Sequence, residues 1–243
     1  MPHALDVALV ILFAALWPLA EYLWLWPRHA RAVEAGVPGA RSGKYTQTLV
    51  EEWILAAAVL ALTFRFARPL STLGLVAPHG WRLWLGVALP LTYLALIVVQ
   101  ARALAAKPES QAKLRQKLEP LRALIPHTPG EFRLFVPLCV TAGICEELLF
   151  RGYLVWVLQS WIGLWAAAGV SMVSFGVGHA YQGFKFGVRA FYAGVFMGLL
   201  ALATRSILPG MALHALIDLG SGWVTYSAMR SGQAADPATR AAV

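Results

Sequence analysis

The chain has 243 residues, of which 59% are hydrophobic and only 13% carry a charge. Soluble domains carry about 25% charged residues, so this composition excludes an ordinary soluble protein and indicates a polytopic membrane protein. The net charge of +8 is spread over loops between apolar runs, which is typical of contact with lipid headgroups and argues against nucleic-acid binding. We expect one membrane domain over residues 1–243, without a second folded domain.

Seven apolar runs are long enough to cross a bilayer, and an eighth crossing arises if one of them is broken. They cover about residues 5–26, 49–66, 81–101, 132–157, 161–179, 187–204 and 206–224. We therefore predict an all-α bundle of about seven transmembrane helices, followed by a short polar tail at 231–243 that is disordered. Lys and Arg are concentrated in the first, third and fifth loops and in the tail, which predicts an outside N-terminus and a cytoplasmic C-terminus.

The loop at residues 108–130 differs from the others because it is both basic and periodic. Four apolar residues recur in it at helical spacing, between Lys and Arg side chains: Leu114, Leu118, Leu121 and Ile125. This pattern predicts a basic amphipathic helix that lies on the inner membrane surface and bends at Pro120. A plain charged linker is the alternative interpretation.

The fourth apolar run contains two adjacent acids, Glu146 and Glu147. An ionised acid near the bilayer centre costs about 2.5–3.5 kcal/mol on insertion scales, so both acids need a reason to be there. On a helix, Glu147 and Arg151 are i,i+4 neighbours on one face and neutralise each other. Glu146 is rotated by about 100° and shares that partner less easily. We therefore predict that Glu147 is paired and that Glu146 is free for chemistry.

Two further polar motifs lie in apolar runs of the same half of the chain. Phe175 precedes His179 by one helical turn, and Asp218 follows His214 by one turn. A lone histidine in a span is more often a hydrogen-bonding residue between helices than a catalyst, and a lone acid–arginine pair is usually structural. Three such features in one small membrane protein instead favour a single shared polar site.

In their order and spacing, the three motifs resemble the CPBP or ABI family of glutamate intramembrane proteases. This family includes type-2 CAAX prenyl endopeptidases and bacteriocin-processing or self-immunity proteins. Residues 178–183 and 208–218 are similar to its bacterial members in particular, and the resemblance covers about residues 132–224. It implies a hydrolase in the inner membrane of a bacterium, which acts on a membrane-anchored or lipid-modified protein or peptide.

The resemblance also implies roles for individual residues. Glu146 and His179 are expected to activate a water for attack on a peptide carbonyl, while His214 and Asp218 stabilise the oxyanion. A carboxylate beside an imidazole is a sound general base, and donors aimed at the oxyanion supply much of the remaining catalysis. The family commonly has Asn where this chain has Asp218. Because an ionised aspartate cannot donate a hydrogen bond, Asp218 either is protonated or holds the ring of His214.

Glu147, Arg151 and Phe175 are predicted to be supporting residues that orient the others. We expect no cofactor and no metal. Glu146 with the two histidines as zinc ligands is the minority alternative, and the chain has no H-E-x-x-H motif to support it. Cys145 adjoins Glu146, but no helical spacing places a histidine beside it, so it is interpreted as a small packing residue rather than a nucleophile.

The predicted function is therefore that of an endopeptidase that hydrolyses a peptide bond of a membrane-associated protein. The alternative is a non-catalytic immunity or partner-binding protein of the same family, and the loss of a motif residue would favour it. A proton-coupled transporter is disfavoured because the sequence shows no internal repeat.

Overall fold

The structure is a computed structural model that describes residues 1–235, and all their regular structure is helical, which confirms the predicted all-α class. The last helix, α11 (Leu208–Ala235), includes residues 231–235, which had been predicted to belong to a disordered tail. The prediction of a disordered tail is therefore wrong for residues 231–235, which are helical. The rest of the predicted tail, 236–243, lies outside the described residues.

The first helix runs without a break through residues 4–34, but its hydrogen bonding alternates between two types. Its α-helical parts are α1 (Ala4–Ile11), α2 (Trp17–Ala20) and α3 (Trp26–Glu34). The two intervening segments are π-helical, and each ends directly before a Trp–Pro pair. Proline has no backbone N–H, and in an α-helix its ring collides with the carbonyl four residues earlier, so a wider turn at this point accommodates it.

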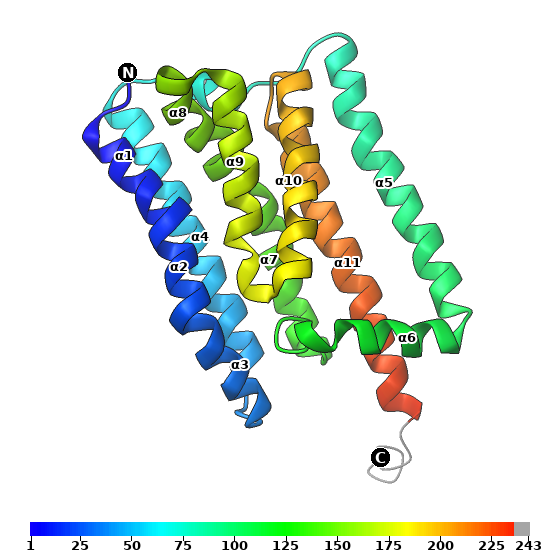
Figure 1. The fold of residues 1–243 in the computed structure, drawn as a ribbon. Helices are drawn as coiled ribbons and strands as arrows, with labels where there is room; N and C mark the ends of the chain where they lie inside the picture. Colours follow the sequence, from blue (N-terminus) through cyan, green and yellow to red (C-terminus); the bar gives the residue numbers. More distant parts are fainter. Residues whose placement is uncertain (236–243) are drawn as a thin grey trace.

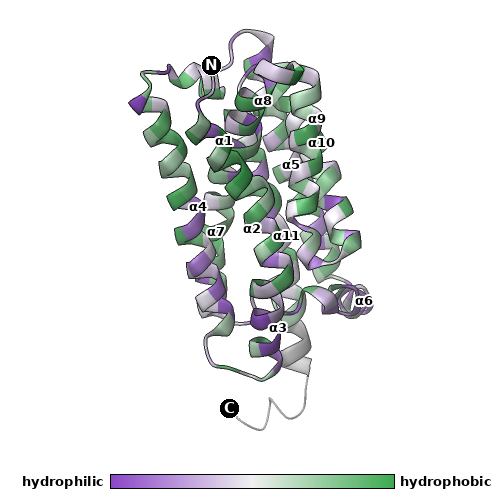
Figure 2. Ribbon diagram, turned by 60° about the vertical axis from the view of Figure 1, so that its left-hand side comes forward, coloured by the Kyte–Doolittle hydropathy of each residue, from purple (hydrophilic) through white to green (hydrophobic). Residues whose placement is uncertain are grey.

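The other helices form one bundle. They are α4 (Ala40–Arg65), α5 (Trp81–Ala105), α6 (Pro108–Leu118), α7 (Pro129–Glu146), α8 (Val155–Ile162), α9 (Leu164–Gly178) and α10 (Phe184–Thr204). All except α6 run along the bundle, and the N-terminus lies at the opposite end from the last turns of α11 (Figure 1). Apolar residues cover most of its length, with hydrophilic residues frequent towards the end at which α3 and α6 lie (Figure 2).

Four helices are long and apolar enough to cross a membrane: residues Ala4–Glu34, Ala40–Arg65, Trp81–Ala105 and Phe184–Thr204. The length and composition of these helices therefore indicate a membrane protein. The other predicted spans, at about 132–157, 161–179 and 206–224, also form helices of the bundle. Their crossing of the bilayer, and hence the total of seven, stays a prediction.

Helix α6 lies crosswise to the bundle, as expected for a surface helix (Figure 1). The predicted amphipathic helix is shorter than expected, because α6 ends at Leu118 and a 3₁₀ turn at Glu119–Leu121 follows. Pro120 therefore ends the α-helix rather than bending it, since it lacks the N–H that another α-helical turn needs. Leu118 and Ile125 are buried and face the bundle.

Helix α7 holds the acid pair at its C-terminal end. Its start is fixed by Thr128, whose hydroxyl accepts from the backbone N–H of Glu131 at 3.1 Å while the Glu131 carboxylate accepts from the N–H of Thr128 at 3.0 Å. Gly143 allows α7 to approach α11 closely, because a Cβ at this position would lie 2.7 Å from the backbone nitrogen of Ala215. The close packing of α7 on α11 places the acids next to the histidine of α11.

After Glu146 the chain changes from an α-helix to a π-helical segment, Glu147–Leu154, before it returns to α-helix in α8. The sequence predicted an uninterrupted α-helix here, so the expectation of regular α-helical geometry is wrong for this segment. All eight of its residues are buried, and the larger apolar core surrounds them. The segment is thus a fixed part of the core and holds the residues next to Glu146 in place.

Candidate active site

The structure brings the three predicted polar motifs together where α7, α9 and α11 meet. Oε2 of Glu146 lies 3.9 Å from Nε2 of His179 and 3.9 Å from Nε2 of His214. Nε2 of His214 in turn lies 3.6 Å from Oδ2 of Asp218. The four residues expected to carry the chemistry therefore line one site, although they come from three helices.

Glu147 forms an ion pair with Arg151, as predicted. Its Oε1 lies 3.1 Å from Nη1 of Arg151, and both side chains are buried. The same Oε1 lies 3.0 Å from Nδ1 of His214, so Glu147 holds the His214 ring as well as the guanidinium. The contact with His214 was not predicted, because the two residues are 67 positions apart and no local spacing indicates it. The sequence suggested Asp218 as the carboxylate that orients His214, and the structure shows that Glu147 also orients it.

Two glycines make room for this buried ion pair. Nη2 of Arg151 donates to the backbone carbonyl of Gly194 at 3.1 Å, and a Cβ at Gly194 would lie 3.2 Å from that nitrogen. A Cβ at Gly210 would lie 3.0 Å from Oε2 of Glu147. Helices α10 and α11 can therefore approach the pair closely, which gives the guanidinium a backbone acceptor in place of water.

His179 is oriented by the end of its own helix. It directly follows α9, and its Nδ1 lies 2.8 Å from the carbonyl oxygen of Phe175. A carbonyl oxygen only accepts, so Nδ1 carries the proton of this hydrogen bond. The ring therefore presents Nε2 to Glu146, and in the neutral ring that atom has a free lone pair.

Phe175 contacts the charged and the aromatic members of the site. The Arg151 guanidinium carbon lies 4.2 Å from the centroid of its ring. The ring centroids of His179 and His214 lie 4.6 Å and 5.7 Å away from it. Because Phe175 is buried and touches all three side chains, it fixes their relative positions, which fits the supporting role predicted for it.

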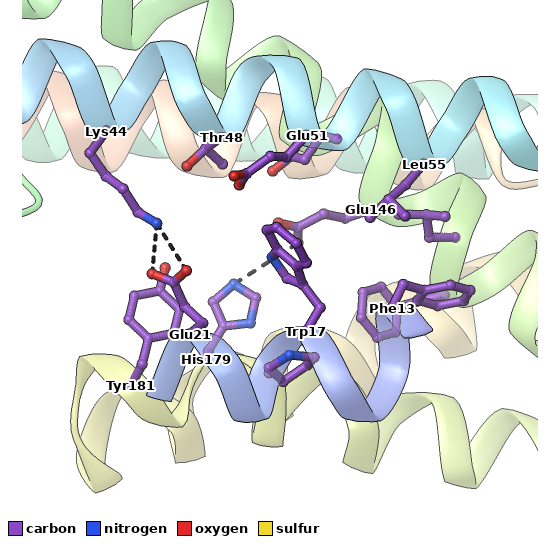
Figure 3. A pocket seen from close by; sticks show the side chains of 15 residues that line it. Phe13, Trp17, Glu21, Lys44, Thr48, Glu51, Leu55, Glu146, His179 and Tyr181 are labelled. Carbon is purple, nitrogen blue, oxygen red and sulfur yellow. Dashed lines mark hydrogen bonds and ion pairs between the residues drawn. The ribbon is translucent and has the colours of Figure 1, made fainter. Parts of the chain in front are cut away.

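Two cavities adjoin Glu146. The larger has a volume of about 630 Å³ and is lined by Glu146, His179, His214 and Asp218, together with apolar side chains of α5 and α6. The smaller has a volume of about 130 Å³ and lies between the first helix and α4. Glu146 and His179 line both cavities, and in the smaller one they lie beside Trp17 (Figure 3).

Several polar residues near the site were missed by reasoning from the sequence. Lys44 lies between the first two predicted spans, but in the structure it is buried in α4, and its Nζ lies 2.7 Å from Oε1 of Glu21 (Figure 3). Glu52 of α4 lines both cavities. The ring of Tyr181 is roughly parallel to that of His179, with 6.4 Å between centroids. Acids at positions 21 and 52, inside apolar runs, were the available signal, because such acids are costly in a membrane.

Among residues 1–235, no three His, Cys, Asp or Glu side chains are grouped so that they could hold a metal ion. Cys139 and Cys145 are both buried and free. Cys145 lies within the larger apolar core, in agreement with its interpretation as a packing residue.

Residues 128–220 match the sequence model of a protein family, described as type II CAAX prenyl endopeptidase Rce1-like. The matched segment contains all three motifs and most of the helices that carry the site. The match supports the family predicted from these motifs, the CPBP or CAAX protease-like family, over residues 128–220. No curated protein and no solved structure matched the chain.

Proposed function

We propose that this protein is an intramembrane endopeptidase of the CAAX-protease-like type, in which Glu146 and His179 activate a water for attack on a peptide bond. The observation that carries the proposal is the contrast between the two adjacent acids. Glu147 is neutralised by Arg151, whereas Glu146 faces a cavity of about 630 Å³ with two imidazole nitrogens 3.9 Å away. The family match supports the same class of reaction.

The separation of Glu146 and His179 suits a water held between them. A water about 2.8 Å from both Oε2 and Nε2 would donate one proton to each atom, because both are acceptors when His179 is neutral. The water oxygen then attacks the carbonyl carbon of the peptide bond as one proton of the water passes to Glu146 or His179. The proton is later delivered to the leaving amine, which completes the hydrolysis without a covalent intermediate.

His214 and Asp218 are the proposed donors to the oxyanion. Nδ1 of His214 already donates to Glu147 at 3.0 Å, so Nε2 donates only if the ring is doubly protonated, with Glu147 as its counter-ion. Asp218 donates from its hydroxyl in the protonated form. Two such donors would stabilise the negative charge that develops on the carbonyl oxygen.

The proposed substrate is a membrane-anchored or lipid-modified protein or peptide. Apolar side chains of α6 and of the turn and loop after it form part of the wall of the larger cavity, so a segment with an apolar attachment has a surface to pack against: Leu114, Leu118, Leu121 and Ile125. We propose further that the protein resides in a bacterial inner membrane with its N-terminus outside. The non-catalytic alternative is not favoured, because no residue of the three motifs is lost.

The proposal is tested by mass spectrometry of protein C-termini in membranes from cells whose own copy is replaced. Three forms are compared: the wild type, Glu146→Ala, and Glu119→Ala as a matched control with an exposed carboxylate. We expect a set of shortened C-termini in the wild type and in the control, and their loss in Glu146→Ala. Identical C-termini in all three strains would contradict a proteolytic function.

A further inference from the structure

Glu52 of α4 has a buried carboxylate oxygen that takes no part in the proposed reaction. Its Oε2 is buried and has no hydrogen-bond partner within residues 1–235, and the same holds for Oε2 of Glu146. Both side chains line the larger cavity and the smaller cavity. Glu52 lies outside the segment 128–220 that matches the family, so its presence at the site is a feature that the structure adds.

The Lys and Arg ion pairs seen among residues 1–235 involve acids other than Glu52 and Glu146. The acids that line these cavities with Glu52 include Glu146 on α7, Asp218 on α11 and Glu51 on α4 itself. Lys44, the cation that lines both cavities, is bound to Glu21 at 2.7 Å. The other titratable groups that line these cavities are His179, Tyr181, His214, Tyr93, Tyr45, Cys139 and Arg189.

We propose that Glu52 is a positioning residue for Glu146, and that the two carboxylates hold one proton between them. The hydroxyl of Glu52 donates a hydrogen bond to the Glu146 carboxylate, and no covalent bond to carbon changes. This inference deepens the proposed function and rests on it. Two carboxylates that share a site do not both ionise readily, because their like charges repel each other in a poorly solvated place.

A hydrogen bond of this kind suits a general base better than an ion pair does. Arg151 forms an ion pair with Glu147, and Glu147 is thereby fixed as a structural group. A donor from Glu52 instead fixes the rotamer of Glu146 and leaves the carboxylate its negative charge and a free lone pair for water. The α4 helix therefore supplies a part of the site that the family motifs do not contain.

Infrared spectroscopy of the detergent-solubilised protein tests the shared proton without any need for activity. The carbonyl stretch of a protonated carboxyl group is compared in the wild type, Glu52→Gln, Glu146→Gln and Glu51→Gln at neutral pH. Glu51 is the matched control because it is adjacent on α4, lines the smaller cavity and accepts a hydrogen bond from Gln47 at 2.6 Å. We expect one band to disappear in Glu52→Gln, to shift in Glu146→Gln and to persist in Glu51→Gln, beside a separate band of protonated Asp218 that all four forms retain. A Glu52→Gln spectrum equal to that of the wild type would overturn the proposal.

Kinetics of the same variants test the positioning role. Glu52→Gln should keep at least about a third of kcat, because its amide still donates to Glu146, whereas Glu52→Ala should lose about 10- to 100-fold in kcat with little change in KM. Equal losses in Glu52→Gln and Glu52→Ala, or full activity in Glu52→Ala, would contradict it. If the wild type shows no cleavage and the infrared pattern is as expected, the proposed function fails and the carboxyl pair stands. If cleavage occurs and the infrared pattern is absent, the carboxyl pair fails alone.

Discussion

Asp6 and Glu146 are both acids in apolar surroundings, and they differ in how completely they are satisfied. Arg68 binds both oxygens of Asp6 at 2.7 Å, the Tyr153 hydroxyl donates to Oδ1 at 2.7 Å, and the backbone N–H of His3 donates to Oδ2 at 2.6 Å. Oε2 of Glu146 has no hydrogen-bond partner in the described chain, and its histidine neighbours stand at 3.9 Å. One acid has all its partners within the fold, and the other has room for a substrate or a water.

Burial alone therefore does not identify a reactive acid. Tyr153 and Glu147 both belong to the π-helical segment Glu147–Leu154, so the same rigid element supports a fully satisfied acid at one end and adjoins an unsatisfied one at the other. A buried acid with complete hydrogen bonding stabilises the fold. An acid that keeps a free oxygen beside a cavity contributes less to stability and is available for chemistry.

Breaking the ion pair beside Glu146 should have the largest combined effect. Arg151→Ala leaves the buried Glu147 carboxylate without its cation, so we expect a loss of about 3–5 kcal/mol in the free energy of unfolding, together with loss of activity. Arg122→Ala is the control, because its pair with Glu119 is exposed and should change stability by less than about 1 kcal/mol. Thermal melting in detergent measures the change in stability of both variants. An inactive Arg151→Ala protein with unchanged melting would instead indicate a direct catalytic role for Arg151.

Removal of an oxyanion donor should have the next largest effect and should act on activity. His214→Ala and Asp218→Leu are each expected to lose at least about 10²-fold in kcat, while Asp218→Asn keeps substantial activity because its amide donates in place of the hydroxyl. The three kcat values are measured with one substrate. If Asp218→Asn is as inactive as Asp218→Leu, a carboxylate is required there, and Asp218 becomes an acid–base group or a metal ligand.

Chelation should have the smallest effect. If Glu146 and His179 activate water without a metal, prolonged treatment with a chelator leaves kcat unchanged within experimental error. Elemental analysis of the active protein is the companion measurement. Stoichiometric zinc in active protein, together with loss of activity on its removal, would replace the proposed mechanism with a metal-assisted one.

Much of the fold and the motif geometry could be predicted from local patterns. Apolar runs predicted the helices to within several residues at most ends, and the i,i+4 spacing of Glu147 and Arg151 predicted the ion pair between them. Where a local rule was broken, the prediction was wrong: the α6 helix ends before Pro120, and the chain turns π-helical after Glu146. A π-helical turn depends on how the segment fits the surrounding core, which local spacing does not show.

The remaining parts of the site depend on contacts between residues far apart in the sequence. Glu147 and His214 are 67 positions apart, and Tyr153 and Asp6 are 147 positions apart. Glu52 belongs to α4, which lies outside the segment 128–220 that matches the family. None of these contacts follows from periodicity or spacing, because each is set by the packing of helices against one another.

The most direct test of the central claim is to neutralise the two contrasting acids in parallel and measure kcat and thermal melting for each. Glu146→Gln should lower kcat by about 10²–10⁴-fold, as expected for a lost general base, and leave the melting temperature nearly unchanged. Asp6→Asn should lower the melting temperature, because Arg68 loses its counter-ion, and leave kcat of the folded protein nearly unchanged. Retention of more than about a tenth of kcat by Glu146→Gln would contradict the claim that Glu146 is the catalytic base.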